Sequence, residues 1–195
     1  MNVEYDLVRA YFEENGFWVR AKEISTEIGK NRFLFPIFEI FNSENSADFY
    51  PESFRIFTSD VTKYSSAVVS LIGWQDSGFS SDLLTSDSRI VKFLRKQIES
   101  HKVAWSEDEF SLLRADKQLI LILPAIPRSE KKAIELFEFF KQNKVQAVLT
   151  LSSVLENLLR RCSENQKSKG NSSFQLLRLL KLYGLATEPQ LNIFD

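Results

Sequence analysis

The run VVSLIGWQ at residues 68–75 contains the end of an expected buried strand. A catalytic or metal-binding site on such a strand often has a charged side chain near this end. Ile72 stands there, directly before Gly73 and Trp74. An isoleucine side chain neither ionises nor binds a metal ion, so this position predicts core packing. Any charged chemistry near this strand end must come from side chains on other elements.

The single cysteine and the single histidine limit other kinds of chemistry. Cys162 and His101 are the only residues of their types, so no disulfide framework, zinc ribbon or Cys–His nucleophilic pair close in sequence can form. His101 is expected at the surface near a helix end. Cys162 adjoins Arg160 and Arg161, which lower a thiol pKa where the groups converge, although a structural cysteine is the preferred interpretation.

Cations with few acids between them gather near the C-terminal end: Arg160, Arg161, Lys167, Lys169, Arg178 and Lys181. Such a group can hold phosphate oxygens in a salt-dependent way, which makes the first four candidate nucleic-acid contacts. Trp74 is a further candidate, because aromatic faces stack on bases. The competing interpretations are a solvated helix face for the cations and packing at a strand end for Trp74.

The composition bounds the class of protein. The chain has 195 residues, 44% of them hydrophobic and 26% charged, which suits one globular domain. Its net charge of −1 creates no strong field toward nucleic acid or an anionic membrane, so such contacts must be local.

No run reaches the roughly 18 apolar residues of a spanning helix. Residues 1–16 resemble an amphipathic helix more than a signal peptide. We expect a soluble cytoplasmic protein without a membrane partner.

Hydrophobic spacing predicts the elements of the first half. A helix is expected over residues 3–14, ended by Asn15-Gly16, followed by a strand over 17–24 and a turn over 25–31. Residues 33–41 form a second strand, with Pro36 at a bulge or an unpaired edge position. Residues 42–51 are a loop, and 52–65 are ambiguous between a short strand and a connection. Residues 67–74 are a third strand.

The second half alternates helices and strands. Ser80 and Ser81 cap a short helical turn, Ser86-Asp87-Ser88 caps a longer helix, and residues 106–115 form another short helix. The strands are QLILIL at 118–123, apolar enough to be buried on both faces, and 145–149. The helix between them, capped by Ser129, makes these two strands parallel neighbours or near neighbours in one sheet. Helices over 150–161 and 174–183 complete an α/β fold with a mixed central sheet flanked by helices.

This order of helix, three strands, helix and strand resembles the restriction-endonuclease-like PD-(D/E)XK phosphodiesterase superfamily. The chain is also similar to uncharacterised bacterial proteins with a GF-L/W-V strand and a V-S-V-K-G-W strand, matched here by YFEENGFWVR at 11–20 and VVSLIGW at 68–74. The resemblance covers residues 3–150. It implies a nuclease-like αβββαβ core over 1–150 with an added αβ unit. Residues 151–195 form a C-terminal helical extension packed on the same domain.

The resemblance also implies where a nuclease site would lie. In that superfamily an acid on the second strand and an acid-x-lysine on the third hold Mg²⁺ and position a water. Ser70 falls at the acid position of the third strand and Ile72 at the lysine position, so the motif is degenerate. Glu39 is the only acid on the second strand, where Pro36 lies nearer the expected position. Glu4 from the first helix and Asp76 from a loop are further candidates.

Three functions follow as hypotheses. The leading one is a nuclease-like domain that has lost metal-dependent cleavage, needs no cofactor, and binds DNA, RNA or a protein. The alternative is an active Mg²⁺-dependent nuclease with a relocated site built from Glu39, Glu4 and either Asp76 or Gln75. The third is a structural module that forms a homodimer through surplus surface phenylalanine, of which the chain has 17.

Overall fold

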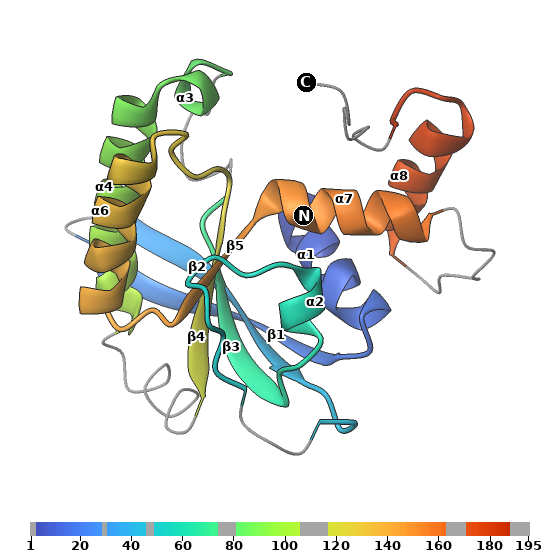
Figure 1. The fold of residues 1–195 in the computed structure, drawn as a ribbon. Coiled ribbons are helices and arrows are strands. Elements are labelled where there is room, and N and C mark those ends of the chain that lie inside the picture. The colour runs from blue at the N-terminus through green and yellow to red at the C-terminus, as the bar shows by residue number, and fades with distance from the viewer. Residues whose placement is uncertain are drawn as a thin grey trace.

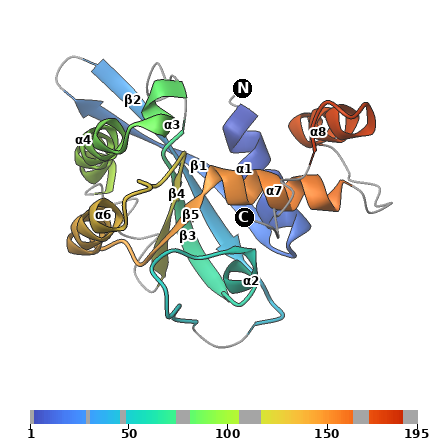
Figure 2. The same cartoon turned by 45° about the horizontal axis from the view of Figure 1, so that its top comes forward.

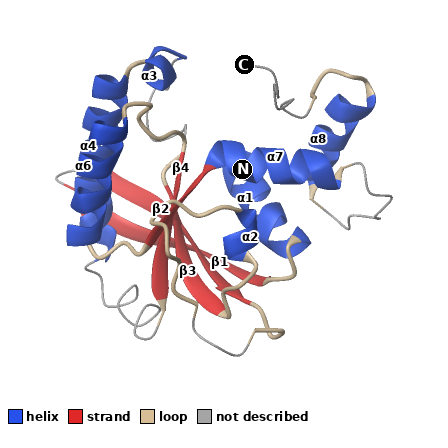
Figure 3. Cartoon of the chain, viewed as in Figure 1, coloured by secondary structure: helices blue, strands red, loops and turns tan. Residues whose placement is uncertain are grey.

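A five-stranded mixed sheet with helices on both faces forms the fold, an open α/β arrangement (Figures 1 and 3). The computed structural model describes residues 3–28, 31–45, 49–73, 81–105, 117–162 and 171–187. The strands, in both chain and sheet order, are β1 (Trp18–Ile28), β2 (Asn31–Phe41), β3 (Ser66–Leu71), β4 (Gln118–Leu123) and β5 (Ala147–Thr150). The pairs β1–β2 and β2–β3 are antiparallel, whereas β3–β4 and β4–β5 are parallel.

The helices are α1 (Val3–Glu14), α2 (Thr58–Val61), α3 (Ser81–Thr85), α4 (Asp87–Trp105), α6 (Glu130–Gln142), α7 (Leu151–Arg161) and α8 (Ser172–Leu182). The α/β class with a mixed sheet is therefore confirmed. The predicted helix over 106–115 lies outside the described residues. None of the helices in the described ranges is both long and apolar enough to cross a membrane.

The first hairpin is longer than its sequence suggests. Gly16, with a φ of 87°, ends α1 in the left-handed conformation that glycine tolerates, as predicted. The expected turn over residues 25–31 is wrong, because β1 continues to Ile28 and β2 begins at Asn31. Pro36 pairs in register with Glu23 of β1, while the pairing of β2 with β3 starts one residue later. The missing proline N–H therefore falls where β2 has only one neighbouring strand.

Alternation along the strands divides the apolar side chains into two layers, one on each face of the sheet. On one face Val69 and Leu71 of β3 pack with residues of α1, α7 and α8. On the other face Val68 and Ile72 pack with residues of α4 and α6. Figure 2 separates the two groups, with α4 and α6 together on one side of the sheet and α1, α7 and α8 on the other.

The two parallel strands confirm the predictions made for them. Leu119 to Leu123 of β4 are fully buried, because helices cover both faces of this strand. β5 is the parallel neighbour of β4, and Ile122 lies opposite Leu149. Thr150 caps α7 by accepting a hydrogen bond from the Ser153 amide at 3.3 Å.

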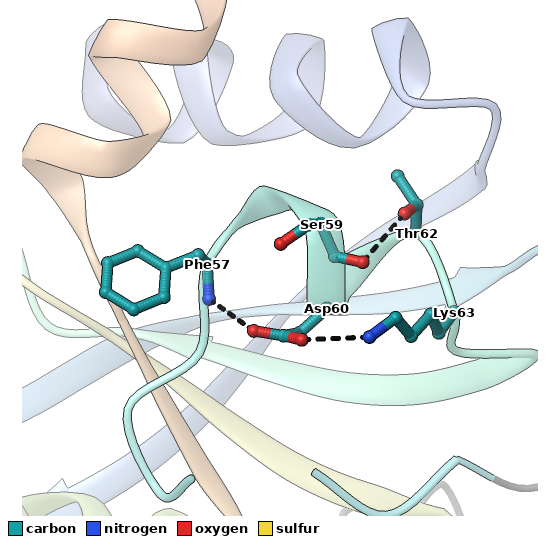
Figure 4. Close-up of polar contacts among 5 residues, drawn as sticks. All are labelled: Phe57, Ser59, Asp60, Thr62 and Lys63. Carbon is teal, nitrogen blue, oxygen red and sulfur yellow. Dashed lines mark hydrogen bonds and ion pairs between the residues drawn. The ribbon is translucent and has the colours of Figure 1, made fainter. Parts of the chain in front are cut away.

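Residues 52–65 resolve into a bridge and a short helix. Arg55 forms an isolated parallel bridge with Val148 at the outer edge of β5. The turn of α2 follows, and the Asp60 carboxylate accepts a hydrogen bond from the Phe57 amide at 3.1 Å and one from the Lys63 ammonium at 3.2 Å (Figure 4). The Thr62 hydroxyl donates to the Ser59 carbonyl at 3.1 Å. This connection thus covers the free edge of β5.

Candidate functional site

The positions where the resemblance implies a nuclease acid and lysine lie inside the apolar layer beneath α4. Ile72 is fully buried and packs in the same cluster as Leu94 and Ile98 of α4. Ser70 lies between Val68 and Ile72 in the alternation of β3, so it faces the same layer. The Ser70 side chain is also fully buried, and its hydroxyl has no hydrogen-bond partner within the described part of the chain.

This environment does not fit a Mg²⁺ ion. Mg²⁺ requires several oxygen ligands, usually carboxylates and waters, in an octahedral arrangement. Ser70 offers one neutral hydroxyl and Ile72 offers no ligand atom, while their neighbours in the layer are hydrocarbon. Within the described ranges, no group of three or more His, Cys, Asp or Glu side chains could hold a metal ion.

Glu4, which the resemblance offers as a helix acid, lies against Gly73, two residues past the end of β3. Its side chain comes from the first turn of α1 and is buried to 8% exposure. A β-carbon added to Gly73 would stand 3.1 Å from the carboxyl carbon of Glu4 and closer still to one of its oxygens. A larger residue at this position would therefore displace the carboxylate end of the Glu4 side chain.

Glu39 belongs to a different part of the sheet. Lys117, just before β4, donates a short hydrogen bond to its carboxylate, and Arg20 of β1 lies 3.6 Å from the other carboxylate oxygen. The three side chains line a hollow of about 390 Å³ together with the exposed ring of Trp18. Glu39 therefore pairs with two nearby cations. The sequence favoured an acid that faces solvent or pairs locally over a metal ligand.

The two candidate carboxylates are not brought together. Glu39 lies opposite Val68 in the β2–β3 register, whereas Glu4 contacts Gly73. Gly73 lies two residues past the end of β3 and five residues from Val68, which corresponds to about 16 Å of extended chain. Asp76 and Gln75, the remaining candidates for a relocated metal site, lie outside the described residues.

The C-terminal cations differ in their surroundings. Arg160 is exposed on α7, whereas Arg161 is half-buried and donates to the Asn15 side chain at 2.9 Å, which joins α7 to the end of α1. Lys181 of α8 donates to the Leu159 carbonyl at 2.6 Å. Lys167, Lys169 and Trp74 lie outside the described residues. Of the four basic candidates, Arg160 is the one that the described surface leaves accessible.

The histidine and the cysteine are structural. The prediction of a surface His101 is wrong: its ring is fully buried in α4, its Nδ1 donates a hydrogen bond to the Gln97 carbonyl at 2.9 Å, and it packs edge-on against Phe35. Burial raises the pKa of the Cys162 thiol, and the nearby Lys181 and Arg178 only partly oppose this rise. The arginines next to Cys162 in sequence therefore do not produce a reactive thiolate.

Sequence reasoning missed Lys117 and Arg20 as partners of Glu39. Lys117 directly precedes the QLILIL run, and the start of a parallel β4 falls beside the start of β3 and the end of β2. The position of Lys117 directly before a strand is visible in the sequence. Predicting its contact with Glu39 from that position also requires the order and register of the strands. No family model matches the chain, and neither a curated protein nor a solved structure matches it.

Proposed function

We propose that this chain is a nucleic-acid-binding domain with a nuclease-like order of elements and without a strand-borne metal site for cleavage. The observation that carries the proposal is the complete burial of Ser70 and Ile72 beneath α4. A metal-bound phosphate cannot reach these positions, and neither side chain has a charge to offer it. When the short helices α2 and α3 are left aside, the order α1, β1, β2, β3, α4, β4 is the helix, three strands, helix and strand of the superfamily that the sequence resembles, which supports the proposal.

Binding in this proposal is local and electrostatic. The overall charge of −1 provides no general attraction to a polyanion. The described residues after Glu156, at 157–162 and 171–187, contain arginine and lysine and no acid. Phosphates held by such cations release counterions, so affinity should fall steeply as salt rises. The unpaired cysteine suits the reducing cytoplasm, where we propose that the protein acts.

The first test is fluorescence anisotropy of a labelled, unphosphorylated single-stranded oligonucleotide across a salt series. We expect salt-dependent binding and a salt slope reduced by about one in Arg160→Ala. Arg9→Ala is the matched control, because Arg9 is also an exposed arginine but is paired with Glu13 at 2.7 Å. Arg161→Ala is unsuitable because it would also break the contact with Asn15.

Two outcomes would redirect the proposal. Absent or salt-insensitive binding would favour a protein partner, because phosphate contacts necessarily respond to salt. Cleavage of the oligonucleotide in Mn²⁺ that disappears in Glu39→Gln would instead support the relocated, Mg²⁺-dependent nuclease. Calorimetric titration of Mn²⁺ into both proteins measures whether metal binding is lost, and circular dichroism of both measures whether folding is lost.

A further inference from the structure

The loops that follow β4 and β5 diverge to opposite faces of the sheet. After β4 the chain turns to α6, whose Leu136 and Phe140 pack in the layer beneath α4. After β5 it enters α7, whose Val154 and Leu158 pack in the layer with α1 (Figure 1). In open α/β sheets this divergence at the carboxyl ends of adjacent strands opens a crevice, which is the usual ligand position.

A hollow of about 510 Å³ lies at this point. Its volume is in the range of pockets that hold small ligands. The loop after β4 contributes Pro124 and Ile126, and Leu155 of α7 and Leu84 of α3 add further apolar surface. A planar or apolar part of a ligand can therefore pack against the walls of the crevice.

Two arginines provide the charge of this hollow. Arg55 enters from the connection before α2, and Arg128 from the loop before α6. No carboxylate is among the described residues that line it, and neither guanidinium forms an ion pair with a carboxylate of the described chain. The Asp87 carboxylate is near Arg128, but it is occupied by two backbone amides.

The backbone holds both arginines in place. On either side of Arg55, the Ile56 amide donates to the Val148 carbonyl at 2.9 Å and the Val148 amide donates to the Phe54 carbonyl at 2.8 Å. The amide of Arg128 itself donates to Asp87 at 2.8 Å. Anchored backbones reduce the conformational entropy lost when the guanidinium groups bind a ligand.

The hydroxyls of the crevice have separate roles. Thr150 already caps α7 and is bonded to Ser152 and Ser153 at 2.9 Å, so we assign it no contact with a ligand. Ser152 is exposed at the rim of the crevice. Anion binding is therefore assigned to the arginines, whose planar groups suit the several oxygens of a phosphate.

We propose that this crevice binds a nucleoside 5′-monophosphate group, with the phosphate between Arg55 and Arg128 and the nucleoside against Pro124 and Ile126. The group belongs either to a free mononucleotide or to the 5′ end of a nucleic-acid strand, which share this chemistry. The proposal does not depend on the oligonucleotide binding described above, since the crevice lies at the first turn of α7, whereas Arg160 is in the last turn.

Calorimetric titrations with AMP, adenosine, and a short oligonucleotide with and without a 5′-phosphate test this assignment. We expect AMP or the phosphorylated oligonucleotide to bind with one-to-one stoichiometry and at least about tenfold more tightly than its unphosphorylated counterpart. Arg55→Gln and Arg128→Gln should each weaken binding by about tenfold. Arg95→Gln is the matched control, because Arg95 is exposed on α4 and does not line the crevice.

Ser152→Glu supplies an independent variant that preserves folding. The first turn of α7 has no acid, and an acid there suits the helix dipole, so thermal stability should be equal or higher. The new carboxylate at the rim should nevertheless abolish phosphate binding. Equal affinity for AMP and adenosine, unchanged affinity in both arginine variants, or no binding of either phosphorylated probe would overturn the proposal. Binding of the unphosphorylated oligonucleotide through Arg160 remains a separate readout in each case.

Discussion

The hydroxyl of Ser70 is fully buried and makes no hydrogen bond with any described residue. An unsatisfied buried hydroxyl destabilises the folded state by about 1–3 kcal/mol relative to an apolar group of similar size. We expect Ser70→Ala to raise the free energy of unfolding by about 1 kcal/mol. Urea denaturation followed by circular dichroism measures this change.

Ser70→Glu restores the acid of the nuclease motif and gives the opposing variant. No lysine or arginine is among the buried residues of the described chain, so we expect the free energy of unfolding to fall by about 3 kcal/mol or more, without any gain in Mn²⁺ affinity. A stable Ser70→Glu protein that binds Mn²⁺ would show that the apolar layer accommodates a metal site.

The sequence predicted the environment of an individual residue where that environment depends on the residue's own side-chain chemistry. The lack of charge at Ile72 correctly indicated core packing, and Glu39, expected either to face solvent or to pair locally, pairs with Lys117. Long-range partners were not predictable: Lys117 lies 78 positions from Glu39, and Arg161 lies 146 positions from Asn15. Helical spacing also placed His101 near a helix end, but it could not reveal that Phe35 covers its ring.

Among the secondary-structure elements, α4 and α6 are joined at their starts by one side chain. The carboxylate of Asp87 accepts hydrogen bonds from the amides of Arg128 at 2.8 Å and Ser129 at 2.9 Å. Ser129 is the N-cap residue of α6, as predicted, but its side chain makes no capping hydrogen bond. Asp87, the first residue of α4, instead binds the amides at the start of α6.

Asp87 makes a pH-dependent contribution to stability. The two amide hydrogen bonds lower the pKa of its carboxyl, so its contribution is complete above the unfolded pKa of about 3.9 and disappears as pH falls through the lower folded pKa. We expect Asp87→Ala to melt at a lower temperature than wild type near neutral pH, with the difference closing at acid pH. Thermal unfolding at several pH values measures this.

Asp82→Ala is the control for that experiment, since Asp82 is an exposed acid in the neighbouring α3, 3.6 Å from Arg89. Exposed ion pairs of this kind contribute little to stability. A melting difference for Asp87→Ala that stayed constant down to acid pH would contradict the assigned role of the carboxylate.

Element types followed from hydrophobic periodicity, because each strand and helix carries its own apolar pattern. β4 and α7 were predicted to within one residue at each end. The first turn was misplaced because Ser25 to Ile28 are polar enough to resemble a loop, yet they continue an antiparallel pairing with β2. Pairing with a neighbouring strand outweighs local propensity in such segments.

For the molecule as a whole, the distribution of apolar surface bears on self-association. The dimer hypothesis relied on phenylalanine left over at the surface, but only Phe41 and Phe57 are among the large exposed apolar side chains of the described residues. The exposed leucines gather instead on and after α8: Leu176, Leu179, Leu182 and Leu185. A symmetric contact through this helix would also bring Arg178 and Lys181 of two copies together.

We therefore expect light scattering to give one monomer mass at all protein concentrations, because like charges oppose the symmetric contact. Leu179→Lys should leave that mass unchanged, and its exposed position means that stability should change little. A mass that rises with concentration in the wild type and returns to the monomer value in Leu179→Lys would contradict this expectation.

The identical order of strands in the chain and in the sheet bears on how the fold is assembled during synthesis. Each strand from β2 onward pairs with the strand made just before it, and even the outer edge of β5 meets a segment made earlier, at Arg55. A chain emerging from the ribosome can therefore add its strands one after another. None of the strands from β2 to β5 depends on a partner strand that has not yet been translated. Unpaired strand edges are therefore exposed only briefly, which limits the aggregation that they cause.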